Sequence, residues 1–315
     1  MSLRRYVIKR LLMVIPVLFG VSVITFSIMQ LVPGDIVDVL LGMDPNADPE
    51  AAERLRQELH LDRPIWEQYL LWLAGVLQLD FGFSPITGDV SETIVTRLPA
   101  TILLGAMGWV IALVLAIPAG VYAAVNKDEL ADDVSRIAAL FGIATPNFWL
   151  GLMLLLVFSL WLGWFPSIPP DVSLLHPSML WYLLLPAITL GTASTALLMR
   201  IMRSSMVEEL NKEYVRTARA KGLPERTVVL KHVLRNSLIS VVTVAALMTA
   251  SIVDGAVVIE VVFSWPGLGE QLITAIGQRD LLVVQGIVLL VGVSIVIANL
   301  LADLVYAWLD PRIRY

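Results

Sequence analysis

The chain has 315 residues, of which 57% are hydrophobic, and its mean hydropathy is +0.80. Only 16% of the residues are charged, and the formal net charge is −5. These values lie far from those of soluble domains. The absence of cysteine excludes disulfides, thiolate metal sites and cysteine catalysis. The composition therefore indicates an integral membrane protein.

Six long apolar runs follow one another along the chain. They cover residues 11–34, 98–126, 137–170, 172–199, 236–253 and 281–302. A helix that crosses the bilayer needs about 20 mainly apolar residues, so the expected fold class is an all-α integral membrane protein with about six transmembrane helices. The first run is longer than the core of a cleaved signal peptide and meets no cleavage site, so we expect it to remain as an anchor.

Lysine and arginine residues are distributed unequally between the segments that join the six runs. If the N-terminus is cytoplasmic, 17 of the 22 Lys and Arg residues lie on the inner side and 5 lie on the outer side. Positively charged residues accumulate in the cytoplasmic segments of membrane proteins. We therefore expect both termini to be cytoplasmic. The stretch 35–92, with twelve Asp and Glu residues against three Arg residues, should then be external.

The runs and their charges divide the chain into three parts. Residues 1–31 form the N-terminal transmembrane helix, and residues 32–97 form an external segment. Residues 98–315 form the core, which contains helices 2–6 and a cytoplasmic loop at 200–236.

Two short helices are expected within the external segment. Asp48 and Pro49 are typical of an N-cap and a first helical residue. The stretch 65–82 is amphipathic and rich in Trp and Tyr, which indicates a helix at the outer membrane interface. The external segment is therefore expected to be partly helical.

Small residues recur every four positions in three of the runs. The stripes are Ala112, Ala116, Gly120 and Ala124; Ala187, Gly191 and Thr195; and Ala246 and Ala250. Such stripes let helix backbones approach closely in lipid. They indicate packing within the bundle, with packing against a second subunit as the alternative.

The loop 200–236 holds nine of the 22 cations. Four residues spaced by four predict one helix with an apolar stripe: Met206, Leu210, Tyr214 and Ala218. Gly222 suits the left-handed position that ends a helix, and Pro224 suits the first turn of the next helix, which should continue into the fifth run. The cations have a simpler alternative explanation, because positive charge beside a membrane keeps a loop on the inner side and attracts anionic lipid. A capped helical hairpin favours docking to a soluble partner.

Two carboxylic acids near the outer end of the fifth run are candidates for the substrate path. Asp254 continues the stripe of Ala246 and Ala250, so it should face protein or a pore. It could line the path, hydrogen-bond to a neighbouring helix or reach toward the lipid surface. Glu260 is expected at the outer interface, either on the path or as a solvated or hydrogen-bonded residue before the turn 264–267.

The chain lacks the motifs of several enzyme classes. It contains no G-x-x-x-x-G-K-S/T phosphate loop, no H-E-x-x-H zinc motif and no G-x-S-x-G nucleophile elbow. We therefore expect no catalytic residue, no metal site and no cofactor bound by this chain. A self-sufficient secondary transporter is the alternative class. Such proteins often use inverted repeats and ionisable residues at the membrane midplane, whereas no repeat is evident here.

The segment EYVRTARAKGLPERTVVLKHVLRNSLISVVT (213–243) resembles the cytoplasmic EAA loop of ABC-importer permeases. The likeness is to the first permease subunit of the dipeptide/oligopeptide/nickel group. It extends over nearly the whole chain, in the blocks RRYVIKRLLMVIPVLFGVSVITF, LVPGD, LDRPIWEQYLLWLAGVLQLDFGFS, RLPATILLG, IATPNFWLG, AVVIEVVFSWPGLG and LDPRIRY. Many separate blocks in the same order make the resemblance specific.

The resemblance implies that the loop is a coupling helix seated in a groove of an ATPase subunit. Arg216, Thr217 and Ala218 occupy the Glu-Ala-Ala positions, and Gly222 is the motif glycine. The leading Glu is absent and the later Leu-Pro reads Leu234-Arg235, as is usual in the peptide branch. The implied coupling residues are Glu213, Tyr214, Arg216, Thr217, Ala218, Ala220, Lys221 and Gly222. Ala218 and Gly222 are expected on the docking surface.

The resemblance also implies the assembly and its place. The chain would be half of a heterodimeric permease in the plasma (cell inner) membrane, with a second permease subunit as its partner. Two ABC ATPase subunits would hydrolyse ATP, and an external solute-binding protein would deliver the solute. A di- or oligopeptide is the expected solute, with nickel, glutathione or a sugar as alternatives. Apart from the lipid bilayer no further partner is implied, and no nucleic acid is expected.

Overall fold

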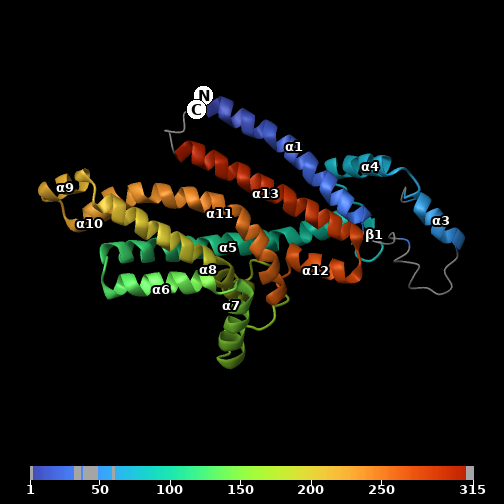
Figure 1. The fold of residues 1–315 in the computed structure, drawn as a ribbon. Coiled ribbons are helices and arrows are strands. Elements are labelled where there is room, and N and C mark those ends of the chain that lie inside the picture. Colours follow the sequence, from blue (N-terminus) through green and yellow to red (C-terminus); the bar gives the residue numbers. More distant parts are fainter. Residues whose placement is uncertain (1–2, 32–36, 38–48, 59–60, 310–315) are drawn as a thin grey trace.

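The structure, a computed structural model, describes residues 3–31, 37, 49–58 and 61–309. In this part of the chain, five helices are long and apolar enough to cross a membrane, and a bent pair is a sixth candidate. The long helices run along one axis of an elongated bundle (Figure 1), which confirms the all-α membrane fold class. The five helices are α1 (Leu3–Gln30), α5 (Val90–Val125), α8 (Pro177–Leu210), α11 (Leu234–Val262) and α13 (Leu281–Leu309).

The first and last helices, α1 and α13, pack side by side in opposite directions (Figure 1). Arg10 of α1 forms an ion pair with Asp303 of α13, with 2.8 Å between Nη1 and Oδ2. Ile15 and Phe19 of α1 are exposed, as expected of a helix whose outer face meets lipid.

The external segment contains the two predicted helices, α3 (Pro49–Glu58) and α4 (Ile65–Leu77). Asp48, the predicted cap of α3, lies outside the described residues. A two-stranded hairpin, β1 (Phe83–Ser84) and β2 (Gly88–Asp89), follows them and was not predicted.

The second spanning helix begins at Val90, eight residues before the predicted apolar run, which starts at residue 98. Oδ1 of Asp89 accepts hydrogen bonds from the backbone N–H groups of Ser91 at 2.7 Å and Glu92 at 3.1 Å. This cap satisfies the first helical donors. The charged residues Glu92 and Arg97, which were assigned to the external segment, lie in the first turns of α5.

The third apolar run is not one straight helix. It forms α6 (Leu130–Ala144), α7 (Asn147–Leu154) and the π-helix η1 (Leu155–Trp161), and its two halves meet at 104°. Pro146 has no N–H and drives Thr145 into an extended conformation with ψ of 124°. The prediction of one continuous span is therefore wrong, and α7 leaves the direction of the bundle (Figure 1).

Small residues bring α5 and α8 together, which agrees with the prediction that the stripes serve packing within the bundle. Ala112, Ala116, Ala124 and Ala187 are all buried. A Cβ added at Gly191 of α8 would lie 2.7 Å from the backbone oxygen of Gly108 in α5. A Cβ added at Gly120 of α5 would lie 2.8 Å from the backbone oxygen of Met199 in α8. These two stripes therefore serve packing within the bundle.

The fifth spanning helix, α11, extends beyond residue 253, where the apolar run was expected to end. It leads through the turn 263–267 into α12 (Leu268–Gln278). The side chains of residues 250–254 lie outside the described part of the structure. The predictions for Ala250 and Asp254 are therefore untested.

The cytoplasmic loop differs from its prediction in one respect. α8 continues to Leu210, and a new helix, α9 (Glu213–Ala220), begins after a two-residue link. The predicted stripe from Met206 to Ala218 therefore does not lie on one helix, although its four residues pack in one apolar cluster. The second helix of the loop, α10 (Glu225–Thr227) with the π-helix η2 (Val228–Val233), continues into α11 as predicted.

Candidate docking hairpin at the cytoplasmic end

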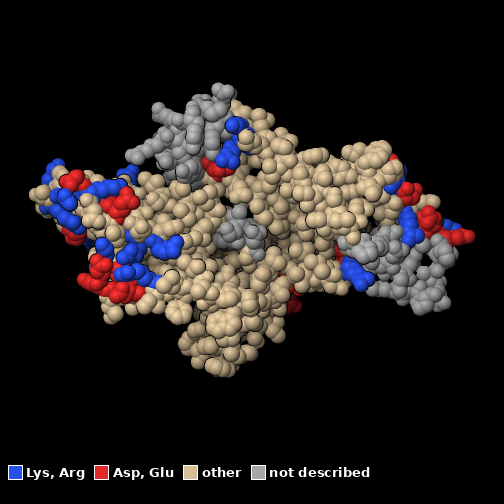
Figure 2. All heavy atoms as spheres, in the orientation of Figure 1, with Lys and Arg blue, Asp and Glu red and all other residues tan. Residues whose placement is uncertain are grey.

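The residues predicted to couple lie on a helical hairpin, which we define as residues 213–233: α9, the turn 221–224, α10 and η2. It forms the tip of one end of the bundle (Figure 1), and Figure 2 shows clustered cationic and acidic side chains at this end. The hairpin thus presents a shaped, charged surface beyond the ends of the spanning helices.

Glycine makes the turn of the hairpin. Gly222 has φ of +74°, a conformation that other residues adopt at a cost. The N–H of Gly222 donates to the carbonyl of Arg219 at 2.9 Å, and the N–H of Leu223 donates to the carbonyl of Ala218 at 3.3 Å. These bonds close α9 as a glycine-ended helix. The predicted role of Gly222 as a helix terminator is confirmed.

One face of α9 packs against the chain itself. Val215 is fully buried and Ala218 is 8% exposed. Both belong to the apolar cluster that contains Met202 of α8 and Val233 of η2. Ala218 was expected on the docking surface, but the structure buries its side chain, which packs α9 on the bundle.

The other face of α9 is free in the described structure. Tyr214 is half-buried, and the remaining predicted coupling residues are exposed: Glu213, Arg216, Thr217, Ala220, Lys221 and Gly222. Arg216 pairs with Glu213 at 2.8 Å on the surface of the helix. This face is the part of the hairpin that a partner can reach.

An ion pair joins the two arms of the hairpin. Nη2 of Arg219 in α9 lies 2.6 Å from Oε1 of Glu225 in α10, and its Nε lies 3.0 Å from Oε2. Because the contact is bidentate, it fixes orientation as well as distance. Sequence reading missed this pair, since Glu225 follows a turn whose geometry sets the contact.

A second polar group ties the root of the hairpin to two spanning helices. The Tyr214 hydroxyl lies 2.6 Å from Oε2 of Glu209 in α8, and Nδ2 of Asn236 in α11 donates to the same hydroxyl at 3.1 Å. Lys212 pairs with the Glu209 carboxylate. We call these four residues the Glu209 clamp.

Tyr214 and Lys212 of the Glu209 clamp remain protonated at physiological pH. Burial raises the pKa of the Tyr214 hydroxyl, and its hydrogen bond to the Glu209 carboxylate raises the pKa further. The hydrogen bond to Glu209 raises the pKa of Lys212. Tyr214 therefore remains a neutral donor and Lys212 remains charged.

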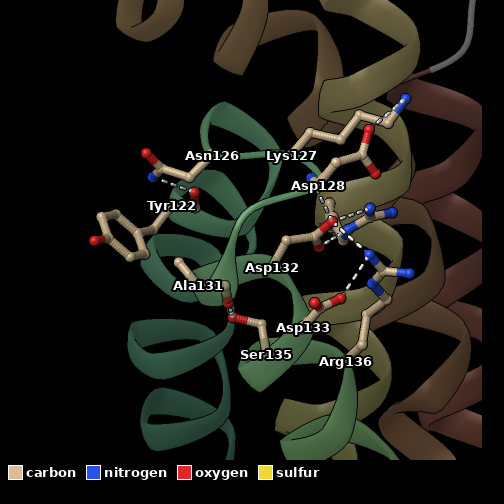
Figure 3. A network of polar contacts seen from close by, with 10 residues as sticks. Tyr122, Asn126, Lys127, Asp128, Ala131, Asp132, Asp133, Ser135 and Arg136 are labelled. Atoms are coloured by element: carbon tan, nitrogen blue, oxygen red, sulfur yellow. Dashed lines mark hydrogen bonds and ion pairs between the residues drawn. The ribbon is translucent and has the colours of Figure 1, made fainter.

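A buried carboxylate joins α6 to α8 near the same end. Asp132 is fully buried, and its Oδ2 accepts hydrogen bonds from the Asp128 N–H at 3.1 Å, Arg136 at 2.9 Å and Arg203 at 2.6 Å. In Figure 3 the side chains of Asp132 and Arg136 converge, whereas the Tyr122 ring points away. Sequence reading missed this network because Arg203 lies on another helix.

Glu260 was expected to reach the outer interface. The structure instead buries it inside the protein. It is fully buried, and its carboxylate accepts hydrogen bonds from the Thr101 hydroxyl at 2.6 Å and the Gly269 N–H at 2.6 Å. The Thr101 hydroxyl accepts a bond from the Leu268 N–H at 2.8 Å. Glu260 and Thr101 together cap α12 and tie it to α5. This arrangement agrees with the alternative prediction that Glu260 is a hydrogen-bonded residue before the turn 264–267.

These features define a class: a multi-pass membrane protein with a helical hairpin at one end of its bundle. Comparison with known proteins then gives the family. Residues 116–315 match the family described as binding-protein-dependent transport system inner membrane component, and residues 3–105 match the N-terminal part of such components. The chain belongs to this family, and it is a multi-pass protein of the inner membrane.

Three relatives match over almost their full length. The chain is 41% identical to the oligopeptide transport system permease protein AppB of Bacillus subtilis and 42% identical to a putative peptide permease protein of Brucella ovis. It is 41% identical to the glutathione transport system permease protein GsiC of Escherichia coli. In each case the match covers 98% of this chain and 99% of the relative. All three relatives are named as transport permeases.

Proposed function

We propose that this chain is one of two different membrane subunits of an ATP-driven importer for peptide-like solutes. The names of the three relatives support this class of solute, since two are named for peptides or oligopeptides and one for glutathione. The proposed partners are a second permease subunit, two ABC ATPase subunits and an external solute-binding protein. ATP is bound and hydrolysed by the partners, and this chain performs no chemical step.

We propose further that the hairpin 213–233 receives the motion of an ATPase subunit. The observation that carries this proposal is the division of α9 into two faces. Val215 and Ala218 fix one face to the bundle, while Arg216, Thr217 and Ala220 on the other face remain exposed. A partner that contacts the exposed face can therefore push on the spanning helices without first ordering a loop.

Reconstitution tests the function. Proteoliposomes that contain this chain and its proposed partners should take up a dipeptide, an oligopeptide or glutathione only when ATP is supplied. Uptake that proceeds without ATP, driven by an ion gradient, would instead show a secondary transporter. Uptake of nickel in preference to every peptide would overturn the proposed class of solute.

A pair of substitutions tests the docking face. Ala220→Trp adds bulk to the exposed face of α9 and should abolish both capture of the ATPase subunits and ATP-driven uptake. Glu129→Trp adds the same bulk at an exposed residue of the α5–α6 turn, outside the hairpin, and should leave both intact. Normal assembly and uptake by the Ala220→Trp variant would contradict docking through this face.

A further inference from the structure

A cavity lies where the third span is broken. Its volume is about 280 Å³, and its walls come from the α6–α7 break, from α8 and from α11. The lining residues include Asn147 of α7, Ser194 of α8 and Gly255 of α11. Sequence reading did not single out Asn147 or Ser194, because the run that holds the break was predicted to be one helix.

The cavity lies within the length of the spanning helices. At about 1.5 Å per helical residue, Asn147 lies about 15 Å beyond residue 137, where the third apolar run begins. Ser194 lies about 9 Å along α8 from Arg200, a cation at the cytoplasmic end. In a hydrocarbon core about 30 Å thick, both residues therefore fall within the span of the membrane.

Two polar side chains face this cavity without partners. Ser194 is only 6% exposed, yet its hydroxyl makes no hydrogen bond with any described residue. The threonines on the same helix behave differently, because each donates to the carbonyl four residues earlier: Thr189, Thr192 and Thr195. The Asn147 amide likewise makes no side-chain hydrogen bond with the described residues. Because neither group is paired within the described structure, both remain available to a molecule that enters the cavity.

The break adds backbone donors at the same place. Asn147 is the first residue of α7, and no side chain caps this end of the helix. The first N–H groups of a helix have no intrahelical acceptor, and the end carries partial positive charge. Within a membrane, such a half-helix end suits an anionic group of a transported solute. Irregular backbone at this depth is tolerated where it lines a cavity.

Among the residues that the structure describes, those lining the cavity supply hydrogen-bond donors and no carboxylate. Apart from Asn147 and Ser194, the lining side chains are apolar, among them Leu190, Leu197 and Met248. Asp254 precedes Gly255, but its side chain lies outside the described residues and takes no part in the argument.

From these observations we infer that the cavity is a subsite of the solute path that binds the carboxylate end of a peptide-like solute. The Asn147 amide, the Ser194 hydroxyl and the first N–H groups of α7 donate to its oxygens. The inference rests on the proposed function and adds to it the part of the solute that is recognised within the membrane.

Cysteine labelling tests the site without requiring transport. The chain has no natural cysteine, so Ser194→Cys places a single thiol in the cavity of the assembled importer. An anionic, water-soluble thiosulfonate should modify this thiol, and a free dipeptide at about ten times its Kd should slow the modification about tenfold. The same dipeptide with an amidated C-terminus should not protect. Thr192→Cys is the control on the same helix and should show no dipeptide-dependent protection.

Each other result of the labelling overturns the subsite. No modification would mean that lipid or a neighbouring subunit fills the cavity. Modification without protection would mean that solute does not occupy it. Equal protection by the acid and the amide would mean that the carboxylate is not the recognised group.

Uptake measurements separate this inference from the proposed function. Ser194→Ala and Asn147→Leu should each lower uptake of the free dipeptide, relative to its amide, by roughly tenfold. Thr192→Val, which removes a hydroxyl already bonded within α8, should leave the ratio unchanged. The ratio cancels any preference of the solute-binding protein. Failure of the wild-type complex to import any peptide would refute the function, whereas normal import with an unchanged ratio in the variants would refute only the subsite.

Discussion

The guanidinium group of Arg203 lies against the carboxylate of Asp132, although 71 residues separate them in the chain. Nη2 of Arg203 donates to Oδ2 at 2.6 Å, and the Asp132 side chain is fully buried. The contact joins the start of α6 to α8, seven residues before α8 ends at Leu210. It therefore fixes the position of the end of α8 that leads into the hairpin.

Removing this carboxylate should destabilise the protein more than removing its neighbour. Asp132→Asn leaves Arg203 in a partly buried site without its anion, and breaking such a pair costs about 3 kcal/mol. Asp133→Asn removes only an exposed ion pair with Arg136 and should cost less than about 0.5 kcal/mol. Thermal unfolding of the detergent-purified variants compares the two losses directly. Equal stability of both variants would show that the buried pair does not hold α6 on α8.

We expect the Glu209 clamp to be needed for efficient coupling between ATP hydrolysis and solute import. Tyr214→Phe keeps the ring and removes the hydroxyl that contacts Glu209 and Asn236, with a loss of about 1–3 kcal/mol locally because one partner is charged. The hairpin should stay folded on Val215 and Ala218, so ATPase subunits should still bind. Solute imported per ATP hydrolysed should fall severalfold, since α9 then moves more independently of α8.

Tyr122→Phe is the matched control for the clamp. Tyr122 is exposed, and its hydroxyl makes no hydrogen bond with the described residues (Figure 3). This variant should import as much solute per ATP as the unaltered protein. If Tyr214→Phe does the same, the clamp is not needed to transmit motion, although the hairpin could still dock.

The elements that sequence predicted well are those fixed by local signals. The apolar runs predicted the spanning helices, and the small-residue stripes predicted close packing within the bundle, which the structure places between α5 and α8. Gly222 ended α9 because a left-handed turn is a local requirement. These features depend on residues near one another in the chain, so composition and periodicity suffice to find them.

The elements that sequence missed depend on contacts between distant segments or on local exceptions. The contact of Glu260 with Thr101 joins α11 to α5 across 159 positions, which periodicity does not reveal. The Asp89 cap is local, but it precedes the apolar run by which the second span was recognised. Pro146 was a visible signal for the break in the third span, but the apolar run on both sides of it outweighed that signal. Ala218 was expected on the docking surface because the resemblance places it in the coupling motif, and a motif does not tell a buried face from an exposed one.

Glu260 should contribute to stability together with Thr101. Its carboxylate accepts from the Thr101 hydroxyl and from the N–H groups of Gly269 and Glu270, and bonds to an ionised acceptor are stronger than neutral ones. Glu260→Gln turns one acceptor into a donor and should lower stability by about 1–3 kcal/mol. Thr101→Val should cost a similar amount.

A double-mutant cycle tests whether Glu260 and Thr101 act as one unit. The combined variant should lose less than the sum of the two single losses, with a coupling of more than about 0.5 kcal/mol. Glu270→Gln removes an ion pair of 3.2 Å with Arg97 at a partly exposed site and should be nearly neutral. Additive losses would mean that the two residues stabilise α12 separately.

Topology can be tested at two exposed positions that form no side-chain hydrogen bond or ion pair with the described residues. Ile86 lies at the tip of the β1–β2 hairpin and Arg226 lies in α10, at opposite ends of the bundle. Because the chain has no natural cysteine, Ile86→Cys and Arg226→Cys each provide a single thiol. An impermeant maleimide added to intact cells should label Ile86→Cys alone, since the cation distribution places α10 inside. Both variants should be labelled after permeabilisation, which controls for accessibility. Labelling of Arg226→Cys in intact cells, with Ile86→Cys protected, would reverse the orientation and place the hairpin where no ATPase could reach it.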